Sequence, residues 1–296
     1  MPGLYLYKSI KFSFSGLLIS LAAFSTNSNA ALKSYTTNGV DLVYSSVSDV
    51  TWMKDANLLK TMMASDSSLV NKILSASPKL IFEYGNSSYY DPLDGFAKLG
   101  YKVTTSDFKA DGQATWFGAN LFINYLNTIN YAGTNNWQLP TFSNKWLTGQ
   151  GPNYPVHNEP SNGTAKGDEF IELFYSELNS TPAYSKGESP SFDPPNPNAG
   201  FNNSNNIFTL AQQSSSFWSG TESPAPEFYC NNGDNCLAKA FTDDGGSFAM
   251  LKQNFSYVWA NTQGQISAVP APAAAWLFAT GLPIVAAAAR RKKQSV

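Results

Sequence analysis

Acidic side chains are the residues of this chain with the clearest capacity for chemistry. Asp168, Glu169 and Glu172 share one short segment, and Asp243-Asp244 form an adjacent pair. Two carboxylates that flank a glycosidic bond can cleave it, with roles set by their separation. The first three are better explained by the positive end of a helix dipole, and the pair before Gly245-Gly246 by a hairpin turn. We therefore predict no catalytic residues and keep a carbohydrate-active enzyme as a distant alternative.

Histidine and cysteine offer little further chemistry. The single histidine, His157, lies in a predicted loop, and no Gly-x-Ser-x-Gly elbow is present to supply a nucleophile. Cys230 and Cys236 enclose five residues, and in an oxidising compartment we expect them to form a small local disulfide. Bridged cysteines leave no cluster for zinc, and no phosphate-binding glycine loop is present.

Calcium is the one cofactor that the loops could hold, since hard cations prefer carboxylate and amide oxygens. Weak candidate ligands are Glu159, Asn162 and Asp234. Asn, Gly and Pro also simply make turns, so the sequence predicts no metal site. Aromatic rings in predicted loops could instead stack on sugars, or pack the loops down: Tyr89, Tyr90, Tyr154, Tyr184 and Phe201.

Charge narrows the range of partners. Six of the 19 basic residues lie near the two ends of the chain, so the body keeps 13 lysines, no arginine and all 21 acidic residues, a net charge of −8. Such a body is poorly suited to nucleic acid, whose affinity depends on phosphate contacts. It would also be repelled by anionic lipid and sulfated polysaccharide.

Both ends of the chain are typical of export. Residues 1–30 are predicted to be a signal peptide, because Lys8 and Lys11 precede the apolar stretch Phe12–Phe24 and Ser28-Asn29-Ala30 resembles a cleavage site. A buried helix is the alternative. Residues 266–296 are predicted to be a membrane-anchoring tail, with an uncharged run, Ala273–Ala289, of 17 residues. From Val269 the helix would be about 31 Å long, close to the roughly 30 Å of a bilayer core.

The basic cluster that follows this run sets its orientation: Arg290-Arg291-Lys292-Lys293. The positive-inside rule keeps these residues cytoplasmic and places the body outside, as the signal peptide also requires. The tail resembles the PEP-CTERM sorting signal, on the motif Val269-Pro270-Ala271-Pro272 and the match that continues to Phe278. The resemblance implies processing by an exosortase-type enzyme. The motif usually has a glutamate where this chain has Ala271, as in several variant signals, so we expect the enzyme that reads this tail to be a variant as well. An ordinary single-span anchor is the alternative.

Residue patterns in the body favour an α+β fold. Periodicity predicts helices at Ser68–Ser75, Trp116–Ile129 with Thr115 as N-cap, and Asp168–Leu178. A strand begins near Val43, and residues 181–206 form a long exposed loop. Short strand candidates follow it: Ile207–Leu210, Ser216–Ser219, Phe228–Cys230, Leu237–Phe241, Ser247–Leu251 and Tyr257–Ala260.

The predicted exported domain, residues 31–265, contains an ordered set of motif residues, which we expect to be structural: Trp52, Asp55, Trp116, Trp137, Leu139, Pro140, Thr141, Trp218 and Ser219. In this order they resemble the motifs of Lcl C-terminal-like domains, which are named for a bacterial collagen-like adhesin. The resemblance implies a C-type-lectin-like fold with two main helices, a small twisted antiparallel sheet and long loops. The family usually has arginine where this chain has Gln138, and another near Thr262.

These observations together predict a non-enzymatic surface or extracellular-matrix protein. Its ligand would be a polysaccharide or a surface protein, bound by the loops at 84–95, 149–167 and 181–206. It would be anchored in the inner membrane through the C-terminal helix and then released to the cell surface or matrix. A structural component of an exopolysaccharide matrix, without a specific ligand, is the alternative.

Overall fold

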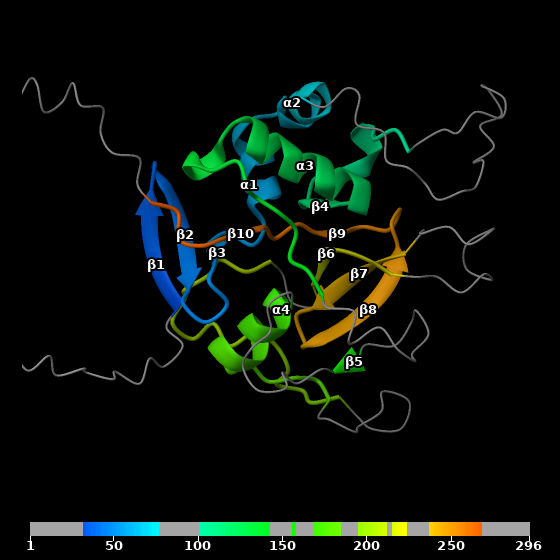
Figure 1. The fold of residues 1–296 in the computed structure, drawn as a ribbon. Coiled ribbons are helices and arrows are strands. Elements are labelled where there is room, and N and C mark those ends of the chain that lie inside the picture. Colours follow the sequence, from blue (N-terminus) through cyan, green and yellow to red (C-terminus); the bar gives the residue numbers. More distant parts are fainter. Residues whose placement is uncertain are drawn as a thin grey trace, which may run out of the picture.

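The computed structural model describes residues 32–76, 101–142, 156–157, 168–184, 195–211, 215–223 and 237–267. Within these ranges the chain has an α+β fold, in which helices lie on either side of two sheets (Figure 1). The predicted α+β class is therefore confirmed. Among these residues no helix is both long and apolar enough to span a bilayer. The predicted signal peptide, the disulfide and residues 268–296 of the predicted tail lie outside the described ranges. Ile266, the first residue of that tail, donates its N–H to the Tyr35 hydroxyl at 3.2 Å and packs against the core.

The first sheet has four strands in the order β1-β2-β3-β10. Their bounds are β1 Leu32–Thr37, β2 Val40–Ser45, β3 Val50–Met53 and β10 Asn261–Gln263, and all neighbours are antiparallel. Asn38 and Gly39 join β1 to β2 with φ angles of 50° and 76°. Two successive positive φ values are typical of the tight hairpin turn that Asn-Gly favours. The strand predicted near Val43 ends at Ser45, because residues 46–49 form a turn.

The second sheet has six strands in the order β4-β9-β6-β7-β8-β5. Their bounds are β4 Gln113–Ala114, β9 Ser256–Tyr257, β6 Ser216–Ser223, β7 Leu237–Thr242, β8 Gly246–Leu251 and β5 Val156–His157. His157 therefore pairs with Gly246 in a short strand, and its prediction as a loop residue was wrong. The predicted strand Ile207–Leu210 is reduced to one bridge, between Thr209 and Asp55.

Helices cover the sheets on two sides. α1 Leu58–Ser65, α2 Leu69–Ala76 and α3 Trp116–Thr128 lie on one side of the β9–β10 segment, and α4 Glu169–Ile171 lies on the other (Figure 1). Single 3-10 turns occur at Thr105–Asp107 and Tyr131–Gly133. The predicted N-cap of α3 is confirmed, because the Thr115 hydroxyl accepts a hydrogen bond from the Gly118 N–H at 3.1 Å.

The predicted helix Asp168–Leu178 is present but changes type along its length. After α4 it continues as a π-helical segment, η4, Glu172–Glu177. The Leu178 N–H donates to the Leu173 carbonyl at 2.9 Å, which is the wider i→i+5 bond of a π-helix. Asp168, Glu169 and Glu172 lie in the first turns of this helix, where the dipole interpretation placed them, and all three are buried.

Aromatic residues from both sheets and from α4 form the centre of the core. Phe170 stacks on Phe241 with ring centroids 5.1 Å apart, and it lies 5.3 Å from Trp52. Trp259, in the segment that joins β9 to β10, lies 5.2 Å from Trp52. Its indole N–H donates to the Met53 carbonyl at 2.8 Å, which satisfies a polar group inside this cluster. The two sheets therefore share one core.

Candidate ligand cavity

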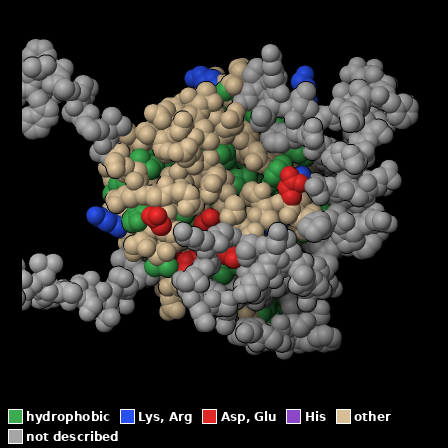
Figure 2. Space-filling view, in the orientation of Figure 1, with side chains coloured by type: hydrophobic (Ala, Val, Ile, Leu, Met, Phe, Trp, Pro, Cys, Tyr) green, Lys and Arg blue, Asp and Glu red, His purple; other side chains and the backbone are tan. Residues whose placement is uncertain are grey.

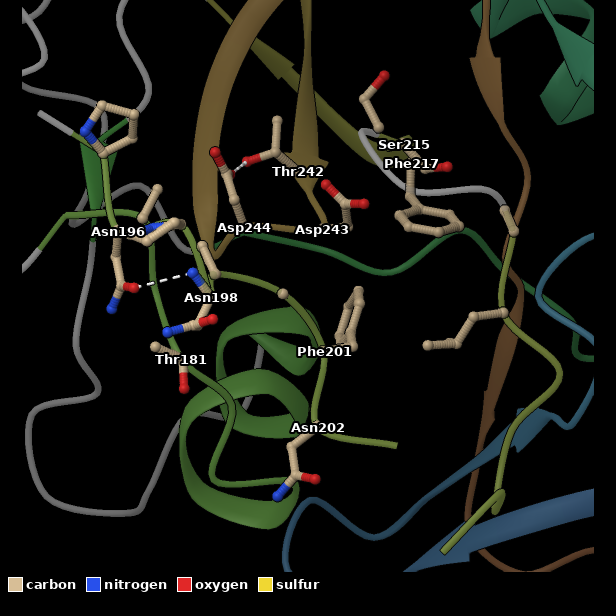
Figure 3. Close-up of a pocket in the computed structure, with 18 of the residues that line it drawn as sticks. Thr181, Asn196, Asn198, Phe201, Asn202, Ser215, Phe217, Thr242, Asp243 and Asp244 are labelled. Carbon is tan, nitrogen blue, oxygen red and sulfur yellow. Dashed lines mark hydrogen bonds between the residues drawn. The ribbon is translucent and has the colours of Figure 1, made fainter. Parts of the chain in front are cut away.

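A cavity of about 1040 Å³ lies at the end of the β7–β8 hairpin (Figure 3). This is at the upper limit of typical ligand pockets, roughly 300–1,000 Å³. Three parts of the chain contribute most of its walls. They are the segment after η4 (residues 181–183 and 195–202), the segment before β6 (residues 210–211 and 215) and the hairpin turn (residues 242–244). The described lining residues are Thr181, Ala183, Pro195, Asn196, Pro197, Asn198, Ala199, Gly200, Phe201, Asn202, Leu210, Ala211, Ser215, Ser216, Phe217, Thr242, Asp243, Asp244 and Phe248.

Backbone hydrogen bonds fix these walls to one another. The Ala183 N–H donates to the Asp244 carbonyl at 2.9 Å, which joins the segment after η4 to the hairpin turn. The Asn196 N–H donates to the Ala183 carbonyl at 2.8 Å, and Thr181 and Gly200 exchange a pair of bonds. The Asp243 N–H also donates to the Ser215 carbonyl at 2.9 Å, so main-chain contacts hold all three described walls, an arrangement that favours a preorganised site.

The hairpin turn has the residues that its geometry requires. Gly245 has φ +88°, and a Cβ placed there would lie 2.7 Å from a ring carbon of Phe174. The Tyr175 hydroxyl donates to the Gly245 carbonyl at 2.9 Å, so η4 also supports the turn. The Asp243-Asp244-Gly245-Gly246 turn is thus confirmed, and the same residues form one wall of the cavity.

Polar groups of several kinds face this space. The Asp244 carboxylate accepts from the Thr242 hydroxyl and from the Gly246 N–H, so its position is fixed. The Asn196 side-chain oxygen accepts from the Asn198 N–H at 2.9 Å (Figure 3), which leaves the amide NH₂ as a donor on the same wall. Amides, hydroxyls and carboxylates together supply donors and acceptors that could bind the hydroxyl groups of a ligand.

Phe201 supplies an apolar surface to the cavity, between Phe217 and Asn202 (Figure 3). Its ring packs on Phe174 at 5.2 Å and on Trp259 at 5.7 Å, yet it stays partly exposed. Phe201 therefore packs its loop against the core, as one of the two sequence-based alternatives expects, and the same ring lines the cavity. Tyr184 follows the lining residue Ala183 but does not itself line the cavity.

Negative charge dominates the described part of the lining. Its charged residues are Asp243 and Asp244, with no lysine, arginine or histidine among the described lining residues. In the orientation of Figure 2, the described surface shows only scattered lysines, without a basic patch. A bound anion would therefore find no opposite charge on the described walls.

A second group of acids lies along α4 and η4 and is buried. Glu169 accepts from the backbone N–H of Thr141 at 2.7 Å and from its hydroxyl at 2.9 Å. Desolvation by burial raises the pKa of Glu169 despite these bonds. Glu172 is 1% exposed, and neither of its carboxylate oxygens has a hydrogen-bond partner. Neither glutamate lines the cavity.

Glu177 completes this second group at the far end of η4. Its Oε1 accepts from the hydroxyl of Ser45 at 2.6 Å and that of Ser48 at 3.1 Å, while Oε2 is buried without a partner. Burial raises the pKa of Glu177 from 4.5 to about 7, and repulsion from Glu172 adds to the shift. No pattern in the sequence singled out Glu177, because its Ser45 and Ser48 partners lie about 130 residues away.

Most motif residues of the predicted exported domain are buried, and none of them lines the cavity. Buried ones include Trp52, Trp116, Trp137, Leu139, Pro140 and Trp218. Asp55 accepts from the Asn57 N–H and the Thr61 hydroxyl, Thr141 donates to Glu169, and the Ser219 hydroxyl donates to the Lys239 carbonyl. Gln138 exchanges two backbone bonds with Asn261, which ties this position to β10 independently of its side chain.

Several residues named from the sequence lie outside the described ranges. They are Tyr89, Tyr90, Tyr154, Glu159, Asn162, Asp234, Cys230, Cys236 and residues 269–296. In the part of the chain that is described, no three His, Cys, Asp or Glu side chains are grouped so as to hold a metal ion. No protein family, curated protein or solved structure matches the chain.

Proposed function

We propose that this chain is a non-enzymatic exported surface or matrix protein that binds polysaccharide in the cavity at the β7–β8 hairpin. The observation that carries the proposal is the cavity itself, which combines side-chain amides, hydroxyls and the partly exposed ring of Phe201. Polar groups can bind sugar hydroxyls, while an aromatic ring packs on the apolar C–H face of a sugar. The segment 195–202 that supplies most of the amides belongs to the loop that the sequence assigned to ligand binding.

The rest of the proposal concerns fold and sorting. The domain would be C-type-lectin-like, an interpretation supported by the mixed sheets, the helices on either side and the long loop that forms a ligand wall. The chain would enter the inner membrane through its C-terminal helix, and an exosortase-type enzyme would process it near Pro270-Ala271-Pro272. The apolar run and the basic cluster of the sequence support this route.

Glycan binding by the whole chain, purified in mild detergent, tests the ligand proposal. We expect binding to immobilised oligosaccharides, with and without calcium, that falls about tenfold or more in Phe201→Ala. Phe108→Ala is the matched control, because Phe108 is also a partly exposed phenylalanine but does not line the cavity. Equal binding by the two variants, or no binding by the parent chain, would contradict the proposal and favour a structural matrix component.

Sorting is tested separately by removing residues 269–296. We expect the truncated chain to leave the membrane fraction and to lose its place at the cell surface. If both forms fractionate to the same compartment, the tail has no sorting role.

A further inference from the structure

A second, smaller pocket lies between the β1–β2 hairpin, the end of β3 and the 3-10 turn Tyr131–Gly133, and we call it the β1–β2 pocket. Its volume of about 380 Å³ is near the lower end of ligand pockets, roughly 300–1,000 Å³, and suits a ligand of one sugar ring. Thr209 lines this pocket and Leu210 lines the larger cavity. The two spaces are therefore separate but lie on the same short segment of the chain.

Hydrogen bonds between its walls hold the β1–β2 pocket in shape. The Asn38 side-chain amide donates to the Ala132 carbonyl at 2.8 Å, which joins the hairpin turn to the 3-10 turn. The Thr209 N–H donates to the Lys54 carbonyl at 2.8 Å, which fixes a third wall. Ala132 has φ +57°, a left-handed conformation that is costly for a residue with a side chain. This held turn carries the adjacent residue, Tyr131, into the lining, so the site is preorganised.

A cation and two fixed carboxylates form the polar part of the lining. The Lys54 Nζ lies 3.9 Å from the Asp41 Oδ2, which is longer than a hydrogen bond of about 2.7–3.2 Å. Within the described structure the Lys54 ammonium donates no hydrogen bond, so its three N–H groups can bind a ligand. The Asp41 Oδ1 accepts from the Thr36 hydroxyl at 2.6 Å, and Asp55 accepts from two groups at the start of α1. Donors and acceptors with set orientations therefore lie beside one another.

Tyr131 and two core residues form the apolar part of the lining. Tyr131 is partly exposed, and its ring packs at 6.3 Å from that of Trp137. Desolvation by burial raises the pKa of Tyr131, and the negative charge of Asp55 adds to the shift, as expected for a hydroxyl near that carboxylate. Met53 and Leu58 also line the pocket and are 2% and 7% exposed. An aromatic ring beside fixed polar groups is suited to a sugar, whose C–H face packs on the ring.

Neutral hydroxyl groups fit this lining better than a charged group does. A hydroxyl both donates and accepts, so adjacent hydroxyls of one ring can bind the Lys54 ammonium and the Asp41 carboxylate together. The opposite charges of these two residues already compensate each other, and a neutral ligand leaves that pair intact. An anion drawn to Lys54 would approach the charges of Asp41 and Asp55 as well.

We infer that the β1–β2 pocket is a second glycan site, which binds one neutral hexose unit through Lys54, Asp41 and the ring of Tyr131. For the class of ligand this inference rests on the proposed function, and it adds a site that the larger cavity does not include. A polysaccharide could then engage the protein at two places. Two linked contacts raise the overall affinity above that of either site where one strand can reach both.

Ligand-observed NMR titration of the whole chain tests this inference, in a detergent without a sugar head group. The probes are the methyl glycosides of glucose, galactose and mannose. We expect at least one to bind with a dissociation constant on the order of 1 mM. Lys54→Met should weaken it about tenfold, because a charge-assisted hydrogen bond is lost. Lys60→Met is the matched control, since Lys60 is an exposed lysine of α1 that does not line the pocket.

A second pair of variants tests the tyrosine. Tyr131→Phe keeps the ring and removes the hydroxyl, so we expect binding of the same glycoside to weaken about threefold. Tyr125→Phe is its control, because Tyr125 is also partly exposed but lies on α3 outside the pocket. If Lys54→Met does not fold, Asp41→Asn provides the same comparison, with the exposed Asp111→Asn as its control.

Equal effects of Lys54→Met and Lys60→Met, or binding of none of the three glycosides, would overturn the inference. So would Lys54-dependent binding of alanine, a zwitterion, in place of the glycosides. Phe201→Ala separates the two proposals, since it should weaken oligosaccharides and leave the Lys54-dependent glycoside unchanged. Oligosaccharide binding that depends on Phe201, without any Lys54-dependent glycoside, would leave the proposed function standing alone. The reverse result would retain the β1–β2 pocket and remove the larger cavity as a glycan site.

Discussion

The two acidic regions of this molecule differ in how their carboxylates are used. Asp243 and Asp244 are partly exposed and line an open cavity. Glu169 and Glu172, on the helix beneath the same hairpin, are buried, and both oxygens of Glu172 have no partner. Both regions have two acidic residues close together in sequence, yet only one is accessible to a ligand.

Burial explains this difference. A carboxylate taken out of water is costly unless it is bonded or protonated, so a buried acid mainly affects folding. A carboxylate in an open turn keeps its charge at little cost and can meet a ligand. Paired carboxylates in a sequence therefore indicate a functional site only where the fold leaves them accessible. The predictions below separate the buried region from the open one.

Removal of an aromatic ring from α4 should have the largest effect. Phe170→Ala empties a site that contacts Trp52, Phe217 and Phe241, so we expect a loss of about 3–5 kcal/mol in the free energy of unfolding. Urea denaturation followed by tryptophan fluorescence measures it. Phe201→Ala is the comparison on the cavity side, and its smaller buried area should reduce the loss to about 1–2 kcal/mol. Equal losses in both variants would mean that the cavity wall is as essential to folding as the core.

Titration of Glu177 should produce the next largest effect. Its folded-state pKa is raised from 4.5 to about 7, so between these values the folded state binds more protons than the unfolded state. Stability should therefore fall as the pH rises from about 4.5 to 7, by about 3 kcal/mol in all. Urea midpoints measured at intervals of pH would show this slope.

Glu177→Gln should remove that slope and be more stable than the parent chain at pH 8. The amide oxygen can still accept from Ser45 and Ser48, and the neutral side chain no longer repels Glu172. Asp111→Asn is the control, because Asp111 is an exposed acid outside this buried group. A slope that persists in Glu177→Gln would show that another buried group titrates.

Local sequence signals predicted the elements that depend on local chemistry. Thr115 capped α3 as expected, and the Asp-Asp-Gly-Gly turn formed between β7 and β8, because a cap and a tight turn are set by neighbouring residues. The π-helical geometry of η4 was not predictable, since its wider bonds arise where a helix packs in the core. β10 was missed because three residues give too short a pattern.

The cavity was predictable in part. The asparagine-rich loop and Phe201 were identified as possible ligand contacts, and both line it. The role of Asp244 was missed, because a turn explains Asp-Gly fully and gives no sign that another loop will approach it. That approach depends on the Ala183–Asp244 backbone bond, between residues 61 apart in sequence. Contacts of this range leave no periodic signal in a single sequence.

Loss of the hydrogen bonds at Glu169 should have a moderate effect. Glu169→Gln keeps one acceptor oxygen but loses the charge that strengthens the bonds from Thr141, so we expect a loss of about 1–2 kcal/mol. Combining it with Thr141→Val in a double-mutant cycle measures the coupling between the two side chains. If the losses in the free energy of unfolding from the two single variants add up to that of the double variant, the Thr141–Glu169 bonds do not hold Thr141 against α4. Glycan binding should be unchanged, since neither residue lines the cavity.

Asp244→Asn should have the smallest effect on stability, about 0.5 kcal/mol or less. Its amide oxygen can accept the same bonds from Thr242 and Gly246, and the residue is partly exposed. Gly245→Ala in the same turn shows that the assay can detect damage there. A Cβ at φ +88° would lie 2.7 Å from Phe174, so a loss of about 1–3 kcal/mol is expected. If Asp244→Asn destabilises the fold as much as Gly245→Ala, its carboxylate has a structural role like that of the buried glutamates, and the two acidic regions are alike.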